Sequence, residues 1–235
     1  MTTSEATPQD GRRGGRVLGR APREDGYGVT LLLTILSIAF LASSAGGLGQ
    51  VVGVALTGVT LLFALRTSGA RPRILRAAQV LVGVAIVSAI LSLRIGDPRW
   101  AATAQAAIGL AVAAIVPPVI LARIARSEEI TYRLVVGALV VYLLIGLCFA
   151  YIFALIALIS GQPFFAQTAA PSNETYIYFS YATLATVGYG DYSAATALGQ
   201  MFAVAEGLFG QLYLVSIVAI VISNIGRSVR GPRGS

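Results

Sequence analysis

One short run contains the residues whose types and spacing could do chemistry, namely residues 186–191 with the sequence TVGYGD. Successive carbonyls of an extended strand point to opposite sides, so aiming them one way requires every second residue to accept mirror-image dihedral angles. Glycine accepts such angles, and Gly188 and Gly190 alternate. The run therefore predicts a column of backbone oxygens that could hold a metal cation stripped of its water.

Composition indicates that this run lies in a membrane protein. The chain is 56% hydrophobic and 11% charged, whereas soluble domains carry about 25% charged residues. A helical crossing needs about 20 apolar residues, and the uncharged runs are long enough for six of them. We expect an all-α membrane protein whose six transmembrane helices lie near residues 29–45, 50–65, 76–94, 100–124, 132–159 and 195–225.

The basic residues predict the orientation of these spans. All 17 are arginine; 15 fall in the N-terminal tail, the second loop, the fourth loop and the C-terminal tail, and only Arg94 and Arg99 lie on the other face. The positive-inside rule then predicts that both termini are cytoplasmic and that segment 160–194 opens from the outside. Because the arginines form no clustered basic face, no nucleic-acid partner is expected.

Residue usage argues against an enzyme and against a resident cofactor. The chain has a single cysteine, Cys148, and no histidine, which excludes an intrachain disulfide, a Ser-His or Cys-His pair and an imidazole metal site. A cleaved signal peptide ending near Ala45 is an alternative for the first apolar run. The long polar region before the run and the span that follows at once favour an uncleaved helix.

Segment 160–194 predicts a short helix before the glycine pair. Pro171 precedes the helix start, Ser172 or Asn173 serves as N-cap, and Glu174 places an acid in the first turn. From Glu174 to Ala185 the helix would be about 18 Å long, too short to cross a bilayer but sufficient for a re-entrant half-helix. Its C-terminal end, the negative end of the helix dipole, would favour a cation.

These features resemble the potassium-channel family. Residues 183–191 match its signature T-x-x-T-x-G-Y-G-D, and about residues 130–226 are similar to its two-helix pore module. The resemblance implies K+ as the transported ion and a homotetramer, because each chain supplies one strand of the filter. The implied plan is a disordered cytoplasmic tail over 1–28, a four-helix N-terminal membrane domain over 29–126, a pore domain with outer helix, pore helix, filter and inner helix over 130–226, and a short cytoplasmic tail over 227–235.

The resemblance also implies the site residues. Asp191 is expected to accept a hydrogen bond from Tyr178 or Tyr181, and Ala182 stands where many relatives carry a carboxylate, which puts the acid-pair account of filter inactivation in doubt. The implied ion-binding filter is Thr186, Val187, Gly188, Tyr189 and Gly190, with K+ held by Thr186 to Tyr189, and the implied filter support is Thr183, Tyr178, Phe179 and Asp191.

The sixth span contains candidate gating residues. Gly210 falls where the family keeps an inner-helix hinge glycine, and close helix packing by a small residue is the alternative reading. Helical spacing from Gly210 places four residues on one face, which would line a cavity or simply pack: Gln211, Leu214, Val218 and Ile222. Ile222 is the candidate constriction near the cytoplasmic end.

Glu206 is the only acidic or basic side chain well inside an expected span. A charged group in lipid is costly, so such a residue is a functional hypothesis by default. Helical spacing turns it about 140° from Gln211, toward the half-helix or a neighbouring subunit. We interpret Glu206 either as a neutral hydrogen-bonding brace or as a proton sensor, and we favour the brace.

The sequence gives no opening stimulus. The fourth expected span has no arginine at every third position and has a Pro117-Pro118 break, so we expect no arginine-ladder voltage sensor. The composition looks bacterial, which predicts a multi-pass protein of the plasma (inner) membrane, with lipids as neighbours and no evident soluble ligand. The alternatives are a non-selective cation channel, a potassium-transporter subunit and a non-conducting or regulatory membrane subunit.

Overall fold

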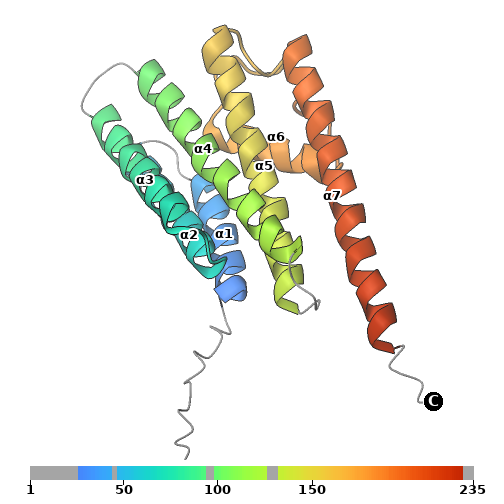
Figure 1. Ribbon diagram of the computed structural model, residues 1–235. Helices are drawn as coiled ribbons and strands as arrows, with labels where there is room; N and C mark the ends of the chain where they lie inside the picture. The colour runs from blue at the N-terminus through green and yellow to red at the C-terminus, as the bar shows by residue number, and fades with distance from the viewer. Residues whose placement is uncertain (1–25, 44–46, 94–97, 126–131, 230–235) are drawn as a thin grey trace, which may run out of the picture.

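The computed structural model describes residues 26–43, 47–93, 98–125 and 132–229 as a set of helices, shown in Figure 1. Within these ranges the strand-like pairing is one isolated antiparallel bridge between Phe165 and Ala194. The helices are α1 (Gly26–Ser43), α2 (Gly47–Thr67), α3 (Pro72–Ser92), α4 (Pro98–Ala125), α5 (Tyr132–Ser160), α6 (Asn173–Leu184) and α7 (Ala197–Val229).

Each expected span has a helix at its position. Among the residues that the structure describes, four helices, α3, α4, α5 and α7, are long and apolar enough to cross a membrane, and the apolar parts of α1 and α2, Gly26–Ala42 and Val51–Thr67, are shorter. The number of crossings therefore stays a prediction. Most of the expected tails lies outside the described residues, although α1 already begins at Gly26 and α7 continues to Val229.

Helix α4 is continuous where the sequence predicted a break. The sequence predicted a break at Pro117-Pro118, and the helix instead runs through both prolines. Each proline removes a backbone hydrogen bond, but neighbouring helices can hold such a segment in a membrane protein. Here α4 packs against α2, α3 and α5, and Val116 and Ile120 on either side of the prolines are fully buried.

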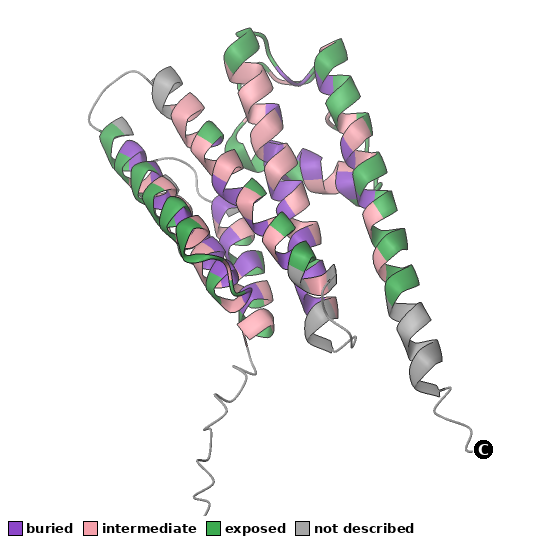
Figure 2. Ribbon diagram, in the orientation of Figure 1, coloured by how far each residue is buried: buried purple, intermediate pink, exposed green. Residues whose placement is uncertain are grey.

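The arrangement has two parts that meet at α5. Helices α1 to α4 pack side by side next to α5, whereas α6 lies crosswise between α5 and α7 (Figure 1). Within the described chain α7 contacts α5 and α6, and most of its surface is exposed, in contrast to the buried stripe of α5 (Figure 2). One chain therefore leaves a long apolar helix without a partner on most sides.

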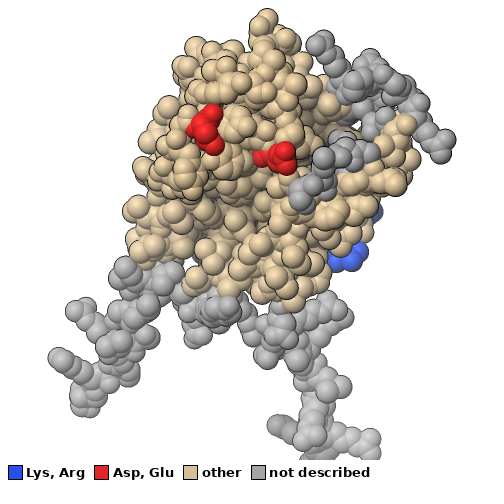
Figure 3. Space-filling view, turned by 180° about the vertical axis from the view of Figure 1, so that it is seen from behind, with Lys and Arg blue, Asp and Glu red and all other residues tan. Residues whose placement is uncertain are grey.

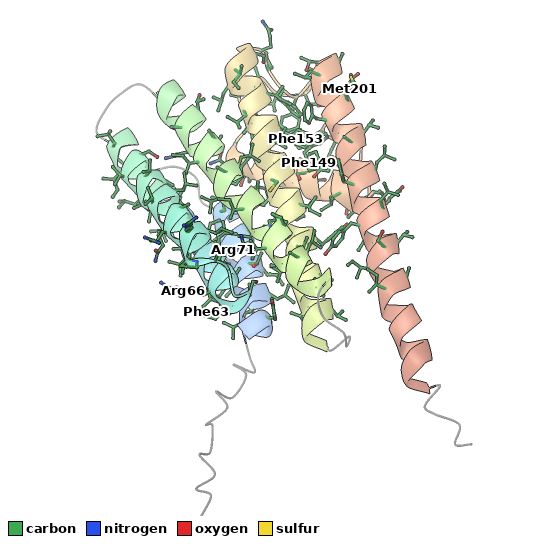
Figure 4. All side chains as sticks on the ribbon, in the orientation of Figure 1. Phe63, Arg66, Arg71, Phe149, Phe153 and Met201 are labelled. Atoms are coloured by element: carbon green, nitrogen blue, oxygen red, sulfur yellow. The ribbon has the colours of Figure 1, made fainter. Side chains whose placement is uncertain are left out.

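Two described arginines lie in one turn of the helix set. The turn between α2 and α3, which carries Arg66 and Arg71, lies at the same end as the start of α1 and the end of α7 (Figure 4). Gly69 adopts a positive φ of 69° and lets the chain reverse there. The described surface on the face shown in Figure 3 presents a few acidic groups and a basic one, and the rest of it is uncharged, as expected for helices that contact lipid.

Candidate ion-conduction site

Helix α6 is the expected half-helix. It begins at Asn173 after an N-cap at Ser172 and ends at Leu184, one residue before the expected end at Ala185. The Ser172 carbonyl accepts the Thr175 N–H at 3.1 Å, and the two hydroxyls of these residues lie 3.1 Å apart. With 12 residues the helix reaches only part of the way across a bilayer, and its C-terminal end leads directly into the TVGYGD run.

The TVGYGD run has the alternating backbone that its glycines predicted. Gly188 and Gly190 have φ values of 61° and 79°, and Thr186 adds a third positive φ of 55°. A left-handed conformation costs a non-glycine residue roughly 1–2 kcal/mol. Two hydrogen bonds from the end of α6 hold the strained residue, because the Thr186 N–H donates to Thr183 O at 2.9 Å and the Val187 N–H to Ala182 O at 2.8 Å.

The run faces open space in a single chain. All residues from Thr186 to Gly190 are exposed, and the Tyr189 side chain is 69% exposed. A Cβ built on Gly188 or Gly190 would meet nothing within 4 Å. The two glycines are therefore required by their backbone conformation and not by crowding within the chain.

Tyr178 supports the run from α6. Its hydroxyl donates to Asp191 Oδ2 at 2.7 Å, and its ring stacks on Tyr189 with centroids 6.1 Å apart. The bond to the carboxylate raises the pKa of the Tyr178 phenol. Tyr181, the other expected donor, bonds instead to Leu143 O at 2.6 Å.

Within one chain Phe179 packs away from the run, and its expected support of the run stays a prediction. Adjacent helix residues point about 100° apart, so Phe179 cannot share the face of Tyr178. It is 8% exposed and its ring centroid lies 5.3 Å from Phe153 and 5.2 Å from Phe165. Phe179 therefore belongs to an aromatic cluster that packs α6 against α5 and the preceding loop, and Phe153 of this cluster is labelled in Figure 4.

Two loops, residues 165–167 and 193–194, are joined by hydrogen bonds that the sequence did not predict, and we call this contact the clasp. Besides the bridge between Phe165 and Ala194, the Ala166 N–H donates to Ser193 O at 3.0 Å. The Gln167 amide then bonds Ser193 twice, accepting from its N–H and donating to its hydroxyl, each at 2.9 Å. The clasp ties the residues after the run to the loop before α6.

Gly210 allows α7 to approach the end of α6. A Cβ at this position would lie 2.6 Å from the Leu184 carbonyl oxygen and 2.8 Å from Leu184 Cδ1, and α7 is continuous there. This contact supports close helix packing, the alternative role that the sequence left open for Gly210. The role of Gly210 as a hinge stays a prediction. Of the expected cavity face, Gln211, Leu214 and Val218 are exposed in one chain, whereas the side chain of Ile222 lies outside the described part.

Glu206 faces α6, one of the two directions that helical spacing allowed. Its side chain is fully buried, and Oε1 lies 2.5 Å from the Ser180 hydroxyl oxygen. Tyr178 on α6, the TVGYGD run that follows it and Glu206 on α7 thus come from three successive parts of the chain.

Residues 137–227 match the family model described as "Ion channel". The matched range contains most of α5, all of α6, the TVGYGD run and nearly all of α7. Comparisons with curated proteins and with solved structures gave no match. Together with the long apolar helices, the match indicates a multi-pass membrane protein with an ion-channel domain, and it favours transport over enzymatic activity.

Removing the Tyr178 hydroxyl should weaken the far end of the run. Tyr178→Phe keeps the ring stacked on Tyr189 but leaves Asp191 Oδ2 without its donor. We expect ion flux into liposomes to decay severalfold faster during prolonged recording, because the run loses one of its anchors. Tyr192→Phe, a change in the adjacent aromatic cluster, is the matched control and should behave like wild type; equal decay in both variants would contradict the anchoring role.

Proposed function

We propose that the chain is one subunit of a homotetrameric channel that passes K+ passively through the carbonyls of Thr186 to Tyr189. The observation that carries the proposal is the positive φ at Thr186, Gly188 and Gly190 directly after a half-helix. This alternation is the backbone condition for several carbonyls to point the same way, and the TVGYGD sequence supplies the rest of the pattern.

The mechanism follows from replacing water by fixed dipoles. A cation entering the ring of carbonyl oxygens exchanges its hydration shell for backbone oxygens, and the C-terminal end of α6 adds the negative end of a helix dipole. Several successive carbonyl rings allow ions to move between similar sites rather than remain in one. Tyr189 supports potassium over sodium, because related non-selective pores replace this tyrosine.

Assembly from four chains explains two features of the single chain. The run of carbonyls is exposed, and α7 presents large apolar side chains over most of its circumference; other copies and lipid would cover both. The basic loops support cytoplasmic termini in a bacterial cell, with the run opening outward. The channel has no arginine ladder in α4, so we propose no charge-carrying voltage sensor.

Potassium and sodium flux into liposomes tests the proposal. Wild-type tetramers should pass K+ in preference to Na+ and be blocked by Ba2+, and Tyr189→Asp should lower the preference by at least about tenfold, equivalent to 1.4 kcal/mol. A preference that survives the substitution would show that the run is not the filter. Equal K+ and Na+ flux in wild type would favour a non-selective channel, and no flux from assembled tetramers would favour a silent subunit.

A further inference from the structure

Three helices meet at the Ser180 hydroxyl. Ser180 lies on α6 and is fully buried, Gly146 belongs to α5, and Glu206 belongs to α7. The Ser180 Oγ lies 2.6 Å from the Gly146 carbonyl oxygen and 2.5 Å from Glu206 Oε1. Both distances are those of close hydrogen bonds between oxygen atoms.

Counting hydrogens decides the protonation of this group. A serine hydroxyl has one proton to donate, and a backbone carbonyl can only accept. If Glu206 were ionised, it too could only accept, and one of the two short oxygen contacts would contain no hydrogen and be repulsive. A proton on Glu206 Oε1 resolves this conflict, because Glu206 then donates to Ser180 and Ser180 donates to Gly146.

We infer that Glu206 carries a proton in the folded protein and completes a hydrogen-bond chain through Ser180 to the Gly146 carbonyl, which ties α7 to α6 and α5. We call these three residues the Glu206 brace. The brace is a positioning device within the membrane domain, and its existence does not depend on conduction by the protein.

The surroundings of Glu206 fit a neutral acid. Oε2 is buried and has no hydrogen-bond partner among the described residues, a tolerable state for an acid carbonyl and a costly one for a carboxylate oxygen. The titratable neighbours on α5 and α6 donate elsewhere, since Tyr142 bonds Leu184 O at 3.1 Å and Tyr181 bonds Leu143 O at 2.6 Å. The described residues place no arginine in an ion pair with Glu206.

The brace lies next to the residues that hold the TVGYGD run. Ser180 precedes by one turn Thr183, whose carbonyl accepts the Thr186 N–H. One turn after Glu206 along α7, Gly210 packs against the Leu184 carbonyl. The brace thus fixes α6 relative to α7 at the point where the carbonyl column begins, and its effect on ion selectivity rests on the proposed function.

Infrared spectroscopy of the assembled protein at neutral pH tests the proton directly. The difference spectrum between wild type and Glu206→Gln should contain the carbonyl stretch of a protonated carboxylic acid, and Ser180→Ala should shift that band because the acid loses its acceptor. Glu174→Gln, which removes an exposed acid at the start of α6, is the control and should remove only carboxylate bands. Loss of a carboxylate band in Glu206→Gln would overturn the inference.

Thermal stability and flux separate the brace from the proposed function. Glu206→Gln should melt close to wild type, because its amide N–H can donate to Ser180, whereas the shorter side chain of Glu206→Asp should lower the melting temperature by roughly 5 °C. A Gln variant that melts well above wild type would indicate a buried charge and contradict the brace. These readings hold whether or not the protein conducts; for a conducting protein, Glu206→Gln should keep the K+ preference and Glu206→Asp should reduce it.

Discussion

Gly188→Ala is expected to reduce potassium flux by at least about tenfold, even though the added methyl group meets nothing within 4 Å in the chain. The reason is conformational. Gly188 has a φ of 61°, and alanine there would relax toward negative φ and turn a carbonyl out of the column. Flux into liposomes, compared at equal tetramer content, measures the effect.

Gly161→Ala is the matched control for this change. Gly161 lies in the loop between α5 and α6, has a φ of 67° and, like Gly188, has no neighbour within 4 Å of the added Cβ. Alanine at position 161 would therefore introduce the same backbone strain as at position 188, but outside the proposed filter. If Gly161→Ala reduced flux as strongly as Gly188→Ala, general destabilisation rather than filter geometry would explain both results.

Gly210→Ala is expected to destabilise the pore domain by about 1–3 kcal/mol. The new Cβ would lie 2.6 Å from the Leu184 carbonyl oxygen, a backbone atom that cannot turn aside, so α6 and α7 must separate. Alanine favours a helix over glycine by only about 1 kcal/mol, which does not offset the clash. Thermal unfolding of the protein in detergent checks the prediction.

Gly207→Ala provides the comparison on the same helix. Its nearest contact would be the Thr183 carbonyl oxygen at 3.8 Å, an ordinary van der Waals distance, so helix propensity should make this variant neutral or slightly more stable. A Gly210→Ala protein of unchanged stability but altered opening would instead favour the hinge. The pair therefore separates the two roles that the sequence left open for Gly210.

Regular patterns in the sequence predicted most of the helices and the backbone of the filter run. Apolar runs placed each helix within a few residues, and alternating glycines predicted the positive φ at 188 and 190. Thr186 escaped prediction because threonine is not a residue that favours positive φ; hydrogen bonds from the end of α6 hold it there.

Tertiary contacts account for the remaining differences. The prediction of a break at Pro117-Pro118 was wrong because packing against α5 outweighs local helix propensity. Phe179 contacts Phe153 and Gln167 bonds Ser193, and because these partners are distant in sequence, no local pattern could predict the contacts. For Glu206, helical spacing left two directions open, and only the structure selected Ser180 as its neighbour.

On the proposed assembly, the exposed TVGYGD run of each chain would link ion concentration to subunit association. A cation bound among several chains interacts with the assembled state and has no comparable site on a separate subunit. By mass action, such a ligand stabilises the assembly by RT ln(1 + [L]/Kd), about 2.7 kcal/mol at a hundredfold excess over Kd. On the proposed assembly, potassium is thus both the transported ion and a structural ligand of the channel.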